Sequence, residues 1–291
     1  MEIILAQLIN GLALGSMYAL VVTGFNLLLL VAGVVQYAYA HIVVIGMYVA
    51  WAVLKATGDN LWLAVPAAIA SATLLSMLTE PLFRPLARRG AVNQSFVMSI
   101  GISLILTHVM ASEVHHGVPI SFPESLSTNK AVLQVGVAAI SVGQIFTFFG
   151  TIAAVIVFLY LLNRTMTGRA LRAMAQGPFV ARLLGIPPVR MGLISYGISG
   201  FLGGITAIFF AMTLGSASST LGDALGLKVI ATALFAGVGN LVGGMICGLI
   251  LGVVECIAIG YLPGHWSDAI AFSMIMVAVF IKPGGLFGAR A

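Results

Sequence analysis

Charged residues are scarce in this sequence: they make up 7% of its 291 residues, whereas a water-soluble domain carries roughly 25%. A chain that is also 60% hydrophobic cannot keep a folded surface dispersed in water, so we expect most of the surface to face lipid. The net charge of +5 does not predict a nucleic-acid partner, because the basic residues stand beside the apolar runs.

Several chemical signatures are also missing. Cys247 and Cys256 are the only cysteines and lie in an apolar run, so we expect packed thiols and neither a disulfide nor a metal site. His115 and His116 lack the further ligands that zinc needs. There is no clustered catalytic set and no G-x-x-x-x-G-K-[ST] phosphate loop, so we expect no cofactor and no ATP hydrolysis by this chain.

The apolar runs are continuous and do not alternate, which argues against a β-barrel and predicts an all-α polytopic helix bundle as one domain, 1–291. The N-terminus carries an acid in place of a basic patch, so we expect the first span to remain in the protein. The predicted spans are 8–31, 36–54, 61–79, 92–112, 137–162, 191–214, 225–238, 240–260 and 268–281.

The run 225–238 is short. At about 1.5 Å per residue it cannot cross ~30 Å of hydrocarbon, so it predicts a half-helix or a re-entrant piece. We therefore expect eight or nine spans.

Basic residues are concentrated on one side of the predicted membrane, and positively charged loops stay cytoplasmic. Ten of the thirteen Lys and Arg residues share this side: Arg84, Arg88, Arg89, Arg164, Arg169, Arg172, Arg182, Arg190, Lys282 and Arg290. The segment 163–190 and the C-terminus are therefore expected in the cytoplasm. The N-terminus lies outside only if every span crosses fully.

Glycines recur at a spacing of four, which places small residues on one helix face and lets two helix backbones approach closely. The series are Gly11 and Gly15, then Gly200 and Gly204, then Gly244, Gly248 and Gly252. They predict helices that pack mainly against protein.

The segment 163–190, NRTMTGRALRAMAQGPFVARLLGIPPVR, predicts a short helix capped by Thr167, a break at Gly177-Pro178 and a second short helix. Its apolar face and arginines suit either a membrane surface or a docked partner. The candidate docking residues are Arg169, Leu171, Arg172, Met174, Arg182, Leu183 and Leu184.

This segment resembles the ATPase-coupling loop of permeases from ATP-driven importers, in the branched-chain amino-acid branch. Three further stretches resemble that branch in the same order along the chain: NGLALGSMYALVVTGFNLL (10–28), GLKVIATALFAGVGNLVGGMICGLILGVVE (226–255) and KPGGLFG (282–288). The resemblance therefore covers essentially the whole chain.

The resemblance implies a permease subunit that works by alternating access in a bacterial inner membrane. Its implied partners are a second permease subunit, identical or sister, two cytoplasmic ATPases, an external solute-binding protein and membrane lipid. The alternatives are an ion-coupled carrier or channel without ATPases, for which Glu255 is the best intramembrane acid, and a membrane-embedded enzyme.

Polar residues inside spans are costly in lipid and face a cavity or each other. Glu255 lies mid-span, and Ser99 and Ser103 share a helix face. Helix-to-helix hydrogen bonding competes with a substrate-lining role for all three, and we keep them as candidates for the substrate path.

The stretch VVQYAYAHIVVIGMY (34–48) adds Gln36, Tyr37, Tyr39 and His41 to the candidate path. It is either an interfacial loop or the start of the second span beside the path. The resembling family begins this span with Asn-Phe-Ala-His-Gly, where this chain has Gln-Tyr-Ala-Tyr-Ala. The departure widens the expected cargo from an aliphatic amino acid to an aromatic or other organic acid, urea or an amide.

Overall fold

The computed structural model describes residues 2–113, 118–123, 126, 131–135, 138–237 and 239–261, and then 269, 272–273, 276, 280, 282 and 285–287. These residues are almost entirely helical. The helices are α1 (Glu2–Ala32), α2 (Tyr39–Thr57), α3 (Leu61–Arg88), α4 (Val92–Glu113), α5 (Val142–Arg164), α6 (Met166–Gln176), α7 (Pro178–Leu183), α8 (Pro188–Leu214), α9 (Leu221–Ala236) and α10 (Leu241–Tyr261). The predicted all-α class is confirmed.

Two short antiparallel strand pairs accompany the helices. Strand β1 (Ile120–Ser121) pairs with β4 (Ser216–Ala217), and β2 (Ala131–Val135) pairs with β3 (Ala138–Ser141). The predicted span 137–162 therefore began too early. Its residues 138–141 form β3, and the helix begins at Val142, where Ser141 and Gln144 form a capping box.

Seven helices of the described chain are long and apolar enough to cross a membrane: α1 to α5, α8 and α10. They correspond to seven of the predicted spans. Helix α9 has 16 residues and is about 24 Å long, too short to cross, as the run 225–238 predicted. The expected span 268–281 lies for the most part outside the described residues.

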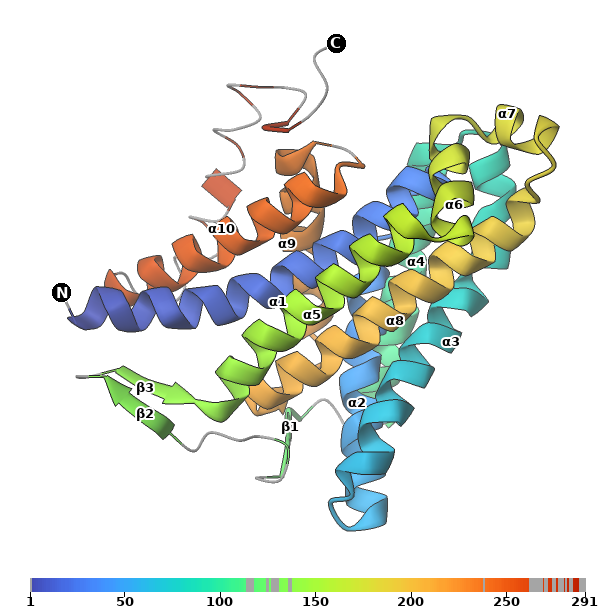
Figure 1. Cartoon of the computed structure of the whole chain (residues 1–291). Helices are drawn as coiled ribbons and strands as arrows, with labels where there is room; N and C mark the ends of the chain where they lie inside the picture. The colour runs from blue at the N-terminus through green and yellow to red at the C-terminus, as the bar shows by residue number, and fades with distance from the viewer. Residues whose placement is uncertain are drawn as a thin grey trace.

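Helices α1 and α10 run side by side along much of their length (Figure 1). Glycines permit this approach, because a Cβ at Gly11 would lie 2.7 Å from Val253 Cα and one at Gly252 would overlap the backbone of Gly15. Helices α3 and α8 meet in the same way, since a Cβ at Gly204 would lie 2.5 Å from Ile69 Cα. The predicted packing role of the glycine series is confirmed.

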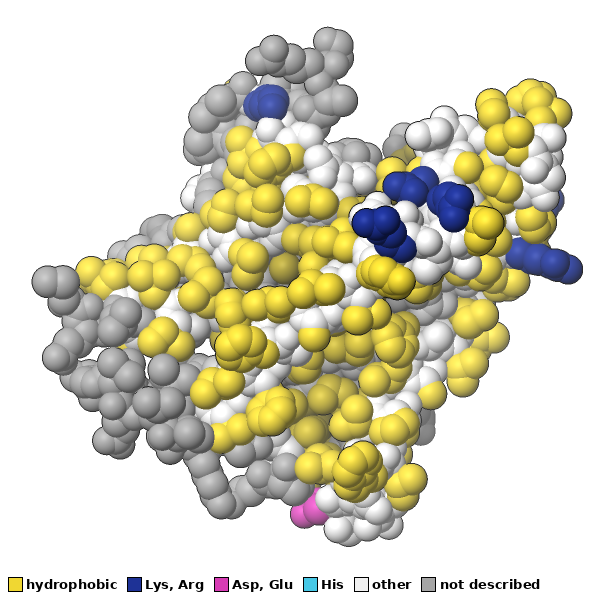
Figure 2. Space-filling view, in the orientation of Figure 1, with side chains coloured by type: hydrophobic (Ala, Val, Ile, Leu, Met, Phe, Trp, Pro, Cys, Tyr) yellow, Lys and Arg dark blue, Asp and Glu magenta, His cyan; other side chains and the backbone are white. Residues whose placement is uncertain are grey.

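The outward faces of α3, α4 and α5 carry large apolar side chains, which suits lipid contact. The exposed residues include Leu74, Leu78, Val97, Leu104, Ile105, Phe146, Phe149, Ile156 and Val157. Figure 2 shows hydrophobic side chains over the middle of the molecule and basic side chains gathered at the end where α6 and α7 lie. Helices α1 and α2 are largely buried and form the centre of the bundle.

Candidate functional site

The chain leaves the helical conformation between α1 and α2 while still inside the bundle. Gly33 ends α1 with a φ of +66°, and residues 33–38 are irregular. Non-helical backbone at membrane depth needs partners within the protein. Here Ala38 N–H donates to Ser99 Oγ at 2.9 Å, and Tyr39 N–H donates to the Gln36 carbonyl at 3.1 Å. Residues 36–38 thus belong to this break, and the second span begins at Tyr39 and not at 36.

The break reaches the middle of the bundle. Gln36 Nε2 donates to Thr79 Oγ1 at 3.0 Å, and Thr79 lies nine residues, or about 13 Å, from the end of α3 at Arg88. Tyr39 OH donates to the carbonyl of Ser199, which lies eleven residues, or about 16 Å, from the start of α8. Helix α2 therefore starts at about the depth of the bundle centre.

Gln36 and Tyr39 are fully buried. Tyr39 joins two helices, because its hydroxyl bonds to Ser199 of α8 while a Cβ on Gly24 of α1 would overlap it. Ser199 Oγ in turn donates to the carbonyl of Gly24 at 2.8 Å. These contacts give Gln36 and Tyr39 a role in fixing the break against α1, α3 and α8.

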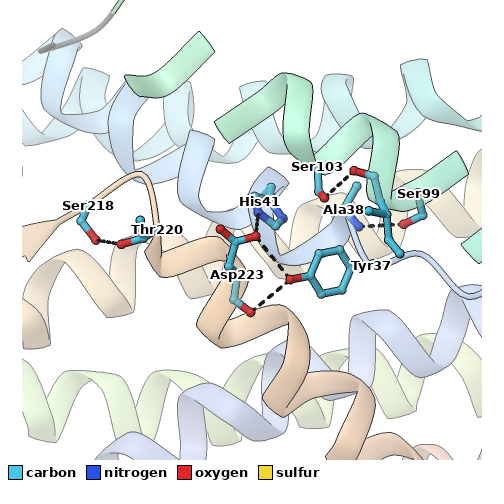
Figure 3. Close-up of polar contacts among 9 residues, drawn as sticks. Tyr37, Ala38, His41, Ser99, Ser103, Ser218, Thr220 and Asp223 are labelled. Atoms are coloured by element: carbon cyan, nitrogen blue, oxygen red, sulfur yellow. Dashed lines mark hydrogen bonds and ion pairs between the residues drawn. The ribbon is translucent and has the colours of Figure 1, made fainter. Parts of the chain in front are cut away.

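Ser99 and Ser103 of α4 are also buried. Ser99 accepts from the backbone of the break, whereas Ser103 Oγ donates to the carbonyl of Ile100 within its own helix at 2.8 Å (Figure 3). Ser99 therefore ties α4 to the start of α2.

Tyr37 and His41 face the first turn of α9, where both meet Asp223 (Figure 3). His41 Nε2 lies 3.0 Å from Asp223 Oδ1, and Tyr37 OH lies 3.3 Å from both that oxygen and the Asp223 carbonyl. The His41 side chain is fully buried, whereas the Asp223 side chain is 47% exposed. The first turns of α2 and α9 thus meet at a half-open acid.

A second polar group joins α1, α9 and α10. Lys228 Nζ lies 2.6 Å from Glu255 Oε1, and Tyr18 OH donates to Glu255 Oε2 at 2.9 Å. The two charged side chains are 9% and 6% exposed. This group (Tyr18, Lys228 and Glu255) fastens the half-helix α9 to the α1–α10 pair.

The segment 163–190 forms the short helices α6 and α7 with the expected break at Gly177. The cap differs from prediction: Thr165 caps α6, because its Oγ1 accepts from Gly168 N at 3.1 Å, so α6 begins before Thr167. Leu171 and Met174 are buried in a cluster with residues of α1, α5 and α8. They therefore hold α6 on the bundle, and their predicted contact with an ATPase stays a prediction.

Other side chains of the segment point outward. Leu183 and Leu184 are exposed, as are Phe179 and Val180, which the sequence did not single out. The predicted arginines Arg169, Arg172 and Arg182 are all exposed, and Arg172 donates to Asn163 Oδ1 at 3.2 Å.

A cavity of about 460 Å³ lies between this helical pair and the ends of α1, α3 and α8. Its lining includes Phe83, Arg84 and Arg88 of α3, and Phe179 and Arg182 of α7. Arg84 also binds the buried carboxylate of Glu80. The cavity separates α7 from α3, so α7 is attached to the bundle mainly through its buried Ala181 and through α6.

Two residues of these clusters were missed in the sequence, Asp223 and Lys228. Each is a charged residue in the otherwise apolar run of α9, and an intramembrane charge is itself a signal of function. The pairing of each with a residue far away in the sequence gave no local pattern to detect.

Seven helices long enough to span a membrane, a break before α2, a half-helix α9 and polar side chains where these two helices meet define a polytopic membrane protein of the solute-transporting kind. The family model described as "Branched-chain amino acid transport system / permease component" matches residues 7–279. The chain belongs to this family.

Relatives of the family match over almost the whole chain. The high-affinity branched-chain amino acid transport system permease proteins BraD of Pseudomonas aeruginosa and LivH of Salmonella typhimurium are each 27% identical, over 98% of this chain and 95% of the relative. The autoinducer 2 import system permease protein LsrC of Enterobacter sp. is 24% identical over 69% of this chain and 61% of its own.

A solved structure described as PsaBC from Streptococcus pneumoniae in complex with Fab has a similar fold. Its TM-score is 0.50 at 14% sequence identity, over 94% of this chain and 91% of that one.

Proposed function

We propose that this permease moves a branched-chain amino acid or a related small organic solute inward by alternating access, driven by two cytoplasmic ATPase subunits. A second permease subunit and an external solute-binding protein complete the assembly. The membrane is the bacterial inner membrane, with α6, α7 and the C-terminus on the cytoplasmic side. The basic side chains gathered at that end support this orientation (Figure 2).

The observation that carries the proposal is the family match over residues 7–279 together with an exposed apolar surface on α7. Phe179, Val180, Leu183 and Leu184 are exposed, with Phe179 at the cavity, on a segment anchored from beneath by buried residues of α6. An exposed apolar patch on an anchored helix pair suits a protein partner that must push on the membrane helices. We name this patch the docking surface.

An ion-coupled carrier is less well supported. Its best candidate for a proton-carrying acid, Glu255, is held at 2.6 Å by Lys228 and receives a hydrogen bond from Tyr18. A carboxylate that is already neutralised by a fixed cation is a poor carrier of a coupled ion.

The test co-expresses the chain with its neighbouring ATPase, sister-permease and binding-protein genes and measures uptake of labelled leucine into proteoliposomes. ATP-dependent uptake is expected, and its absence for every amino acid or small organic solute offered would overturn the proposal. The double variant Leu183→Asp/Leu184→Asp should lose the ATPases on co-purification while remaining folded. Leu63→Asp, the same change at another exposed leucine, in the first turn of α3, is the matched control and should retain them.

A further inference from the structure

The structure describes the surroundings of three acidic side chains on the spanning helices and the half-helix α9. Two of them are similar, and the third, Asp223, differs. Glu80 and Glu255 are buried, and each is paired with a fixed cation, Arg84 or Lys228. Asp223 is half exposed at the depth where α2 begins, and among the described residues no lysine or arginine pairs with it. An acid in such a place faces a wet path or a ligand.

The orientation of Asp223 is held by packing. A Cβ on Gly222 would lie 2.6 Å from the His41 ring, and one on Gly226 would lie 2.8 Å from the Tyr37 ring. These two glycines let α9 lie directly on both rings, so His41 and Tyr37 reach the same carboxylate oxygen, Oδ1.

Both donors, His41 and Tyr37, bond to one oxygen of the Asp223 carboxylate, Oδ1. Within the described part of the chain no hydrogen bond reaches Asp223 Oδ2. A histidine with its proton on Nε2 and a tyrosine hydroxyl are neutral donors, so they orient the carboxylate without cancelling its charge. Asp223 lies in the first turn of α9, at the positive end of the helix dipole.

We propose that Asp223 binds the ammonium group of the transported solute at the centre of the membrane, which makes the cargo an amine or a zwitterion. Tyr37 and Phe96, whose ring centroids are 6.4 Å apart, provide aromatic surface beside the same acid. A solute that carries only a carboxylate is repelled from this position. This inference rests on the proposed transport function and names the chemical group that the path selects.

The test compares Asp223→Asn with Asp223→Glu in the full complex, at saturating loaded binding protein. Asparagine keeps an oxygen acceptor for His41 and Tyr37 but loses the charge. Because a hydrogen bond to a charged group contributes about 1.5–3 kcal/mol, Asp223→Asn should lower leucine uptake per ATP hydrolysed about 10- to 100-fold, and Asp223→Glu should restore part of it. Asp59→Asn makes the same change in the loop between α2 and α3 and is the control.

Full leucine uptake by Asp223→Asn would overturn the inference and leave the transport function intact. So would transport of a cargo that lacks an amine. A wild-type complex without ATP-driven uptake would instead overturn the transport function.

A second measurement needs no transport. In purified permease, isoamylamine should raise the unfolding temperature of the wild type but not of Asp223→Asn, whereas isocaproate, the matching acid, should raise neither. Equal effects of the amine on both proteins would refute the inference.

Discussion

The ion pair of Lys228 and Glu255 gives the sharpest prediction about stability. Its two atoms are 2.6 Å apart and both side chains are nearly buried. At an effective dielectric constant of about 20, two unit charges at this distance attract by roughly 6 kcal/mol, and much of that offsets the cost of removing them from water. The net value of the pair is therefore small, whereas the cost of leaving one charge alone is large.

Replacing one partner should destabilise the protein more than replacing both. Lys228→Met or Glu255→Leu alone should cost about 3–5 kcal/mol, because each leaves an uncompensated buried charge. At roughly 2 °C per kcal/mol for a long chain, each single variant should unfold about 6–10 °C lower. The double variant should lose less than either single one, with the loss of the hydrogen bond from Tyr18 OH to Glu255 as the main residual cost.

The chain offers a built-in reporter for this experiment. Cys247 and Cys256 are its only cysteines, and both are buried in α10, the helix that carries Glu255. Reaction with a thiol-specific fluorophore on heating therefore follows the release of α10. Lys55→Met, the same change at an exposed lysine, is the control and should stay within about 0.5 kcal/mol of wild type.

The double-variant cycle can refute this reasoning. If the two single losses simply add in the double variant, Lys228 and Glu255 do not act as a pair. If both singles match the control, the buried charges are solvated by some other means and the argument from burial is wrong.

Two further predictions concern packing. Gly252→Ala should separate α10 from α1 and lower the thiol-reported unfolding temperature, because its Cβ would overlap the backbone of Gly15. The control Gly101→Ala, which has open space around it in α4, should be neutral or stabilising by up to about 1 kcal/mol. Equal effects of the two changes would contradict the packing argument. Tyr39→Phe removes one hydrogen bond to the Ser199 carbonyl and should cost about 1–3 kcal/mol because that buried carbonyl loses a donor, so an unchanged unfolding temperature would count against this anchoring role.

The candidate site was only partly visible in the sequence. Local composition was enough to single out Gln36, Tyr37, Tyr39 and His41, because four polar residues stand out in an apolar chain. Local composition could not show which of these four residues have a structural role and which face another polar group. Tyr39 and Gln36 fix the break against other helices, whereas Tyr37 and His41 face Asp223, 186 and 182 residues away in the sequence.

The coupling segment shows the same limit. Its helix–break–helix form was predicted from Gly177-Pro178 and the arginine pattern. Which apolar side chains face inward depends on how α6 lies on α1, α5 and α8. Leu171 and Met174 are buried there, while Leu183 and Leu184 are exposed. Sequence spacing gives the faces of a short helix but not the face that its neighbours cover.

The sequence by itself determined that the protein lies in lipid, that its fold is all-α and where most of the spans lie. Continuous apolar runs and scarce charge leave helices in lipid as the stable arrangement. It also determined the packing role of the glycine series, because small residues at a spacing of four share one helix face. Only the tertiary structure decided that α2 begins in the centre of the bundle, that Lys228 neutralises Glu255 and that Asp223 stays half open. The physical reason is that these are contacts between helices distant in sequence, and the depth and rotation of each helix are set by the neighbours that pack against it.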